Sequence, residues 1–373
     1  MLVDGVMERG TTSEGREGAL QRLVSARIPG GRLLSVRPLG PDPTFAAGAT
    51  EKVAGYGQPL LLSVELPGGR IRLVFRTATA NEFGHDRRAD RAADALLSFD
   101  RFGLIPSHAR ALDVGAVMAD GELRSLAGSG ELYLLTDYVE GTPYAQDLRR
   151  IAEGGAANAR DERRCERLAR YLVRLHREKR PAAAYRRSVR DLLGHGEGIF
   201  GICDAYPEGV PAAPPGRLRA LERRCLDWRW RLRGFEHRGA RTHGDFHPFN
   251  ILFQRGGKPA LLDAARGCAG DPADDVTALS VNYVFFAVDA EGAWERGLGD
   301  LWRLFFRTYL AGSGDEELLL VAPPYLAWRL LVVCLPRFYP RLSRRGRDRL
   351  LGLAERALDS ERFDPAMAED LFR

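Results

Sequence analysis

The first part of the chain alternates short apolar runs with turns that contain glycine and proline. Runs of this length, bounded by such turns, predict strands over residues 32–39, 58–66 and 70–78. The Pro-Gly-Gly sequence at residues 67–69 predicts that the last two strands form a hairpin. Apolar residues at helical spacing predict helices over residues 19–28 and 86–102. The run E-L-Y-L-L-T-D-Y-V at residues 131–139 predicts one more strand.

Beyond residue 139 the apolar positions recur at steps of three and four, which is typical of amphipathic helices. This spacing predicts helices over residues 161–179, 217–233, 272–287, 291–310, 316–321, 325–335 and 343–358. A small antiparallel sheet with one principal helix is therefore expected to precede a larger, mainly helical part. The pattern predicts an α+β protein.

With 373 residues the chain is long enough for two lobes, each with its own core. Residues 1–18 are polar and glycine-rich, and we expect a poorly ordered extension there. An N-terminal lobe is expected over residues 19–138 and a helical C-terminal lobe over residues 139–373. Within the second lobe, residues 180–240 form an insertion that precedes a conspicuous polar loop at residues 242–253.

Composition narrows the possible classes of protein. The apolar fraction is 45% and the net charge is +5, with arginine supplying nearly all of the positive charge, so neither value indicates nucleic-acid binding. The most apolar stretch, residues 318–336, is interrupted by Pro323, Pro324 and Arg329, which predicts buried helices and no membrane span. Neither a secretory signal nor a Cys-x-x-Cys pair is seen, and the five scattered cysteines favour a cytoplasmic protein with reduced thiols.

The polar loop holds the strongest chemical pattern in the chain. Residues 242–253 read T-H-G-D-F-H-P-F-N-I-L-F, with Asp245 five positions before Asn250. A second acid, Asp263, follows the next apolar run, and two short strands joined by a Gly-Gly turn would bring these three side chains together. Phosphoryl transfer uses such a set, because one carboxylate accepts the hydroxyl proton while an amide and a second carboxylate hold Mg²⁺ against the ATP phosphates.

This ordered pattern, H-G-D-x-H-P-x-N followed by an Asp and G-D-P-x-x-D-V, resembles the aminoglycoside phosphotransferase and choline kinase superfamily. The resemblance is dense over residues 242–276 and thinner elsewhere. It implies the bilobal protein kinase-like fold. The matching positions are His243, Gly244, Asp245, His247, Pro248, Asn250, Asp263, Gly270, Asp271, Pro272 and Asp275.

The resemblance also implies a role for each of these positions. Asp245 is expected to orient the substrate hydroxyl and accept its proton. Asn250 and Asp263 are expected to bind Mg²⁺ through oxygen atoms. His243 and Asp275 are expected to brace the loop rather than to carry protons.

The resemblance identifies fewer matching residues for the ATP site than for the catalytic loop. Residues 40–57 contain several glycines and form either a flap over the phosphates or an ordinary surface loop. No lysine occurs on the predicted strands, so Arg76 is the candidate for the phosphates, with a solvent-facing arginine as the alternative. Either Asp90 or Asp94 would pair with it. Adenine contacts at the hinge between the lobes are expected from Asp137, Tyr138 and Val139.

The charge of the predicted insertion bears on the phosphate acceptor. Aminoglycosides are polycations and require carboxylates, whereas the helix predicted over residues 217–233 is rich in arginine. That arginine face is either solvated or oriented towards an anionic molecule. We therefore expect a small neutral or anionic hydroxyl compound, with an aminoglycoside or other antibiotic as an alternative acceptor. The sequence does not distinguish ATP from GTP or indicate the oligomeric state.

A different class of function is a catalytically weak, kinase-like nucleotide-binding module. The missing strand lysine, the absence of a G-x-G-x-x-G motif and the Ala264-Ala265 pair after the metal-binding position favour it. Phe249 also departs from the small residue common at its position. Against this reading, a pure scaffold has no chemical need for Asp245, Asn250 and Asp263 together. A protein acceptor is disfavoured because no activation segment separates Asp263 from Asp271.

Overall fold

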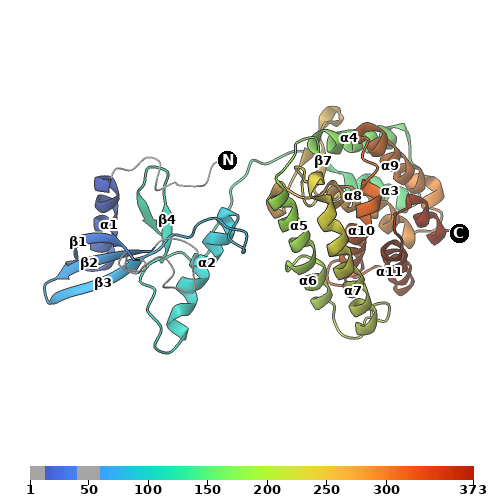
Figure 1. Ribbon diagram of the computed structural model, residues 1–373. Coiled ribbons are helices and arrows are strands. Elements are labelled where there is room, and N and C mark those ends of the chain that lie inside the picture. Colours follow the sequence, from blue (N-terminus) through green and yellow to red (C-terminus); the bar gives the residue numbers. More distant parts are fainter. Residues whose placement is uncertain (1–12, 40–58) are drawn as a thin grey trace. The chain divides into compact units, whose positions relative to one another are not determined.

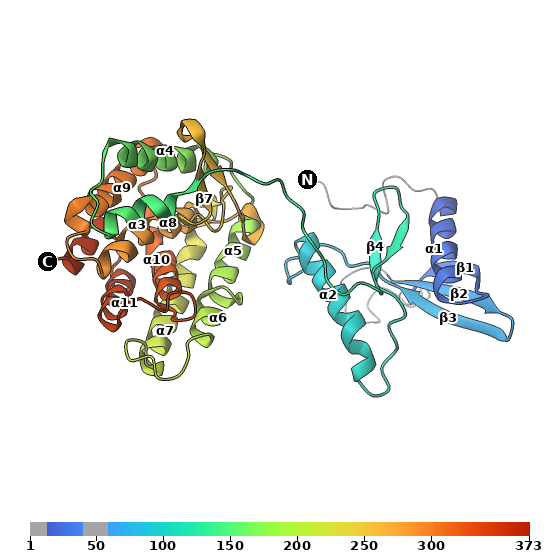
Figure 2. The ribbon, with the colours of Figure 1, turned by 180° about the vertical axis from the view of Figure 1, so that it is seen from behind.

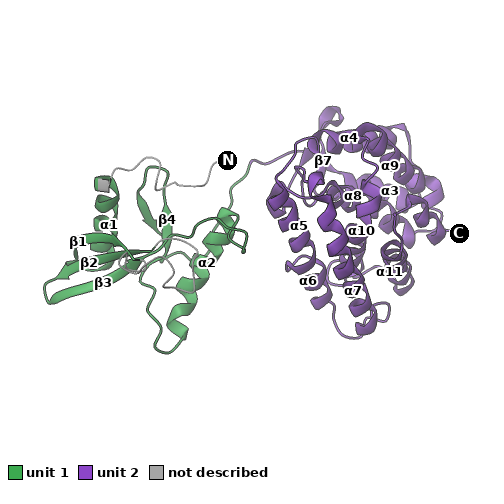
Figure 3. Cartoon of the chain, viewed as in Figure 1, with its two compact units in different colours: residues 1–136 green, residues 137–373 purple. Residues whose placement is uncertain are grey.

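The structure is a computed structural model that describes residues 13–39 and 59–373. The chain divides into two compact units, residues 1–136 and residues 137–373 (Figure 3). Unit 1 contains the larger antiparallel sheet and unit 2 is mainly helical (Figures 1 and 2). The predicted α+β class is confirmed. The glycine-containing segment 40–57 lies outside the described residues.

Unit 1 is built on a three-stranded antiparallel sheet with the order β1-β2-β3. The predicted hairpin is present, since β2 and β3 pair in continuous register from Leu60 opposite Phe75 to Leu66 opposite Gly69. A separate pair, β4 and β5, follows the helix α2. The bounds are β1 (Arg32–Pro38), β2 (Leu60–Leu66), β3 (Gly69–Phe75), α2 (Arg88–Arg101), β4 (Gly115–Val117) and β5 (Leu123–Ser125).

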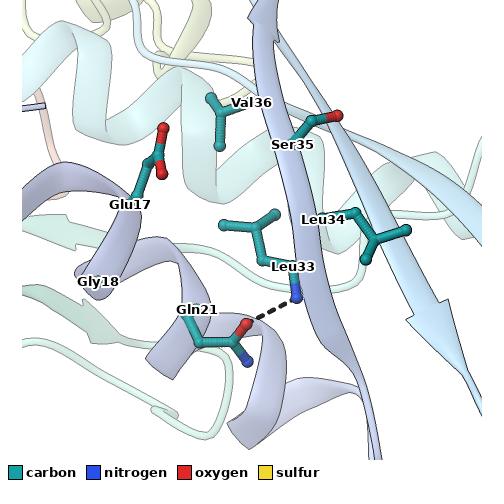
Figure 4. Close-up of a pocket in the computed structure, with 7 residues that line it drawn as sticks. All are labelled: Glu17, Gly18, Gln21, Leu33, Leu34, Ser35 and Val36. Atoms are coloured by element: carbon teal, nitrogen blue, oxygen red, sulfur yellow. Dashed lines mark hydrogen bonds between the residues drawn. The ribbon is translucent and has the colours of Figure 1, made fainter. Parts of the chain in front are cut away.

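Helix α1 (Ser13–Arg27) covers one face of this sheet. Its Gln21 side chain accepts the backbone N–H of Leu33 on β1 at 2.6 Å, beside a small pocket between helix and strand (Figure 4). The helix begins at Ser13, so the expectation of an unstructured segment up to residue 18 was wrong for its last part. Its first turn is mostly exposed, and the buried Ala19, Leu20 and Val24 farther along anchor the helix on the sheet. The core consists of Leu20, Val24, Leu62 and Val64.

The strand predicted over residues 131–139 is absent. This segment has no regular structure, and Tyr133 and Tyr138 are 93% and 90% exposed. A strand needs a neighbour to bond its backbone groups, and no backbone hydrogen bond joins this segment to another described strand. The residues instead form the connection between the two units. Apolar composition alone was a misleading signal here.

Unit 2 packs its helices around a single large core. A small antiparallel sheet, β6 (Thr142–Pro143), β7 (Ile251–Phe253) and β8 (Pro259–Leu261), lies at the polar loop. The helices are α3 (Tyr144–Ala152), α4 (Ala159–Leu175), α5 (Ala182–Gly194), α6 (Ile199–Asp204), α7 (Pro215–Leu232), α8 (Pro272–Val288), α9 (Gly299–Ser313), α10 (Leu318–Cys334) and α11 (Arg344–Asp359).

The helices α8 and α10 pack against each other in this core. The sequence predicts a break at Pro323-Pro324, yet α10 continues through both prolines and buries almost all of its side chains. Burial of the apolar helix outweighs the local cost of proline, so the prediction of two separate helices was wrong. None of the helices in the described ranges combines the length and the apolarity needed to cross a membrane.

Candidate active site

The polar loop at residues 242–250 leads directly into β7, and β8 returns beside it. Ile251 on β7 pairs with Leu261 on β8, and the backbone N–H of Leu262 donates to the carbonyl of Asn250 at 2.9 Å. Asp263 directly follows Leu262, so its backbone lies beside Asn250. The structure produces the pairing of short strands that the sequence predicts around this loop.

Asp275, in the first turn of α8, holds the start of the loop. Its carboxylate accepts the backbone N–H groups of His243 at 2.7 Å and Gly244 at 2.8 Å. The ring of His176 lies behind it, with Nε2 at 3.1 Å from the carboxylate and Nδ1 at 2.7 Å from the Tyr309 hydroxyl. Burial raises the pKa of Asp275, but hydrogen bonds from His176 and the two backbone groups outweigh burial and lower it. A buried carboxylate thus fixes two consecutive peptide groups of the loop.

His243 contributes to the same support. Its Nδ1 lies 3.3 Å from the backbone N–H of Asp245, so Nδ1 is the acceptor and the proton of the neutral ring is on Nε2. Burial lowers the pKa of the ring, which keeps the imidazole neutral. This arrangement suits a brace better than a proton carrier.

Gly244 occupies a position that other residues do not fit. Its φ of +84° lies in the left-handed region, and a Cβ at this position would collide with the carbonyl oxygen of Ala265. Ala265 also donates its N–H to the carbonyl of His243 at 2.8 Å. The polar loop and the segment after Asp263 are therefore in direct backbone contact, and that contact requires a glycine.

Gly244→Ala is expected to lower the free energy of unfolding by about 2–4 kcal/mol, because the substitution adds both a steric collision and an unfavourable φ. Urea unfolding measures this change. Gly216→Ala in α7 is the matched control, since a Cβ there meets no atom within 4 Å and φ is not positive. Equal stability of the two variants would contradict the proposed tight contact.

The carboxylate of Asp245 is held by three side chains. The Asn250 amide lies 3.2 Å from Oδ2, His247 Nε2 lies 3.3 Å from Oδ2, and Arg329 Nη1 lies 3.0 Å from Oδ1. Burial raises the pKa of Asp245, but the hydrogen bond of His247 and the charges of Arg329 and Arg266 hold it well below its usual range. The side chain is still 30% exposed. Asp245 is thus an oriented, ionised and accessible carboxylate.

Arg329 on α10 is a residue that sequence reasoning missed. It is 6% exposed and donates to three groups: Asp245, the carbonyl of Gly244 at 2.9 Å and Asp274 at 2.6 Å. Its guanidinium also lies 4.0 Å from the ring centroid of Trp328. The available signal was a lone arginine in an apolar helix, because a charge in such a place must have a partner.

Asn250 and Asp263 are the candidates for holding Mg²⁺. The Asn250 amide nitrogen donates to Asp245, and among the described residues nothing donates to its Oδ1. The exposed carboxylate of Asp263 likewise has no hydrogen bond or ion pair within that part of the chain. No group of three or more His, Cys, Asp or Glu side chains there could hold a metal ion. Two protein oxygens still fit Mg²⁺, which usually takes its remaining ligands from phosphates and water.

The backbone at Asp263 is unusual. Its φ is +52°, and Arg266 and Cys268 follow at +53° each. Left-handed conformations are uncommon for non-glycine residues, and they persist only where surrounding contacts hold them. Here the bonds from Leu262 and Ala265 fix both sides of Asp263. The segment is therefore a constrained turn at the predicted metal position.

The predicted nucleotide residues of unit 1 are not brought together. Arg76 follows β3 with an exposed side chain and makes no ion pair within the described residues. Asp90 caps α2 by accepting the backbone N–H of Arg87 at 2.9 Å. Asp94 lies 3.9 Å from His85. Pairing of Arg76 with either acid stays a prediction.

The predicted hinge residues lie at the junction of the units. Asp137 and Tyr138 are exposed, Val139 is half-buried, and the segment has no regular structure. Adenine contacts at these residues stay a prediction.

Comparisons with known proteins identify the family. A model of the phosphotransferase enzyme family matches residues 63–312, well over half of the chain. No curated protein sequence matches. A glucosamine kinase structure has 16% identity and a TM-score of 0.40, covering 93% of this chain and 81% of that one. In its other crystal form the match covers 58% of each chain, at 18% identity and a TM-score of 0.39.

Two further structures are similar at the same low level. A type I macrolide 2'-phosphotransferase has 16% identity and a TM-score of 0.28, covering 94% of this chain and 98% of that one. A choline kinase from Cryptosporidium parvum has 11% identity and a TM-score of 0.32, covering 95% and 92%. The family match agrees with the resemblance seen in the polar loop. The chain belongs to the phosphotransferase enzyme family.

Proposed function

We propose that this protein is an ATP- and Mg²⁺-dependent kinase that transfers the γ-phosphate to a hydroxyl group of a small molecule. The observation that carries the proposal is the grouping of Asp245, Asn250 and the start of the Asp263 turn by the β7–β8 pair and Asp275. This grouping offers one candidate proton acceptor and two candidate oxygen ligands. The family match supports the same reaction class.

In this mechanism the acceptor hydroxyl binds beside Asp245, which orients it and takes its proton as the phosphate is transferred. Asn250 and Asp263 would hold Mg²⁺, whose charge stabilises the phosphate oxygens when it is bound. His243 and Asp275 keep the loop rigid, so that Asp245 does not have to be reoriented during the reaction. Arg76 is the candidate for contacting phosphate, and Asp137, Tyr138 and Val139 are the candidates for contacting adenine.

The charges around the loop support a neutral or anionic acceptor over a polycation. Arg329 binds both Asp245 and Asp274, and Arg266 lies 3.6 Å from Asp274, so the charges of these two carboxylates are already offset by two arginines of the protein. A polycation would have to compete with a buried guanidinium for them. The arginine face of α7 partly serves structure, because Arg217 and Arg224 pair with carboxylates of α11.

A catalytically weak nucleotide-binding module is the second candidate. The observation in its favour is the exposed Arg76, which forms no ion pair among the described residues. The two candidates differ in turnover. ADP release is measured with ATP, Mg²⁺ and a panel of hydroxyl compounds. Release that depends on one of these compounds supports the kinase. Nucleotide binding without ADP release in the presence of any of them supports the module.

Asp263→Ala is expected to abolish the Mg²⁺-dependent part of nucleotide binding, because Asn250 alone is a poor site for a divalent cation. Titration of ATP with and without Mg²⁺ measures this effect in wild type and variant. Asp204→Ala, at an exposed aspartate that ends α6, is the control and should bind like wild type. Unchanged Mg²⁺ dependence in Asp263→Ala would remove Asp263 from the metal site.

A further inference from the structure

Phe249 begins a continuous row of aromatic side chains at the catalytic loop. Its ring stacks on Phe286 with centroids 6.4 Å apart, and Phe286 contacts Phe285 edge-on at 5.3 Å. Phe285 in turn contacts Tyr339 edge-on at 4.7 Å. We call Phe249, Phe285, Phe286 and Tyr339 the aromatic wall. Its members come from the loop, the last turn of α8 and the segment after α10.

The aromatic wall is accessible, unlike most aromatic residues of unit 2. Phe249 is 37% exposed, and the other three members are half-buried. The preceding part of α8 is fully buried, so exposure begins at Phe285 and Phe286. Aromatic rings that are left partly open at the end of a buried helix offer apolar area to a ligand.

The wall is continuous with the catalytic residues. Phe249 lies four positions after Asp245 in the same loop, and its ring contacts His247 at 5.7 Å, whose Nε2 reaches Asp245. The Phe249 end of the wall thus lies beside Asp245, where the acceptor hydroxyl would bind.

Local charge decides what kind of molecule fits this surface. Aromatic faces accept either an apolar ring or a quaternary ammonium group. The nearby carboxylates of Asp245 and Asp274 are both bound by Arg329, and Arg266 lies 3.6 Å from Asp274. The two guanidinium groups offset the charges of these two carboxylates, so the pair leaves little net negative charge to attract a cation.

We infer that the aromatic wall is the acceptor subsite and that it binds the apolar face of an uncharged alcohol with a sugar, alicyclic or aromatic ring. This inference rests on the proposed kinase function and names its substrate class. The ring lies against Phe249 and Phe286, and one of its hydroxyl groups reaches Asp245. Phe249, which departs from the small residue common at this position, then acts as a specificity residue.

Binding and turnover are measured separately to test the inference. Calorimetric titration without nucleotide compares uncharged ring alcohols, such as phenyl and methyl glucosides, with choline and kanamycin. The variants are Phe249→Ala and Phe286→Ala, and Phe249→Leu keeps an apolar side chain of similar volume. Trp230→Ala is the matched control, because this α7 residue is 61% exposed and contacts Arg229 and Arg233 rather than the wall. Thermal unfolding checks that each variant is folded.

Of the compounds tested, an uncharged ring alcohol should bind wild type most tightly. Its affinity should be about 10-fold lower in both alanine variants, partly restored in Phe249→Leu and unchanged in Trp230→Ala. Preference for choline or kanamycin, binding by no uncharged alcohol, or affinities within about twofold of wild type in both alanine variants would each overturn the inference. ADP release with ATP and Mg²⁺ is the independent readout. If the wall variants weaken binding of the alcohol but no ADP is released, only the kinase function is contradicted. If ADP is released but the wall variants bind the alcohol like wild type, only the subsite is contradicted.

Discussion

Asp245→Asn is expected to slow phosphoryl transfer by roughly 100- to 10,000-fold, the range that a positioned general base contributes. Asparagine keeps the shape of the side chain and leaves an oxygen for Arg329, so the loop should stay in place. It cannot accept the hydroxyl proton. Product formation with the acceptor that gives ADP release is the measurement, at saturating ATP and Mg²⁺.

Two controls separate lost chemistry from lost structure in this experiment. The nucleotide affinity of Asp245→Asn should match wild type, since Asn250, Asp263 and the Asp275 support are unchanged, and thermal unfolding should show that the variant is folded at the assay temperature. Asp204→Asn changes an exposed aspartate on α6 and should leave the rate unaltered. A variant that retains more than about a tenth of the wild-type rate would exclude Asp245 as the base.

Arg329→Met is expected to cost about 3–5 kcal/mol of folding free energy, since removing one partner of a buried ion pair strands the other. Asp274 is buried and would lose its closest cation at 2.6 Å, while Asp245 and the carbonyl of Gly244 would each lose a hydrogen bond. Urea unfolding measures the loss. Arg329→Lys should fall between wild type and methionine, because lysine keeps the charge but not the paired donors.

The matched control for this prediction is Arg303→Met on α9. Arg303 also pairs with two carboxylates, Asp300 at 2.8 Å and Glu369, but its side chain is 49% exposed. Exposed pairs of this kind contribute about 1 kcal/mol or less. If both methionine variants lost the same small amount of stability, the buried ion pairs of Arg329 would not stabilise the fold more than an exposed pair does.

The polar loop could be predicted from the sequence because its residues are close in the chain. Asp245 and Asn250 are five positions apart, and the Gly-Gly turn after β7 leaves few ways to place Asp263. Helix α8 could be predicted equally well, with predicted bounds of 272–287 and observed bounds of Pro272–Val288. Local spacing and turn chemistry determine these features, and both can be read from one sequence.

Contacts between distant segments could not be predicted in this way. Arg329 meets Asp245 across 84 positions in the chain, and only the packing of α10 against α8 brings it there. The run at residues 131–139 has the composition of a strand but no bonded neighbour, and α10 continues through two prolines because it is buried. In each case contacts with other parts of the fold determine the local structure, and these contacts cannot be read from the local sequence pattern.

Helix α8 places different functions at its two ends. Asp275 near its first residue holds the backbone of the catalytic loop, and Phe285 and Phe286 in its last turn belong to the proposed acceptor subsite. About three helical turns separate Asp275 from Phe285. Substitutions in the last turn can therefore alter which alcohol is bound while the loop keeps its shape. A phosphotransferase built in this way can diverge towards new acceptors in few mutational steps, with the chemistry itself preserved.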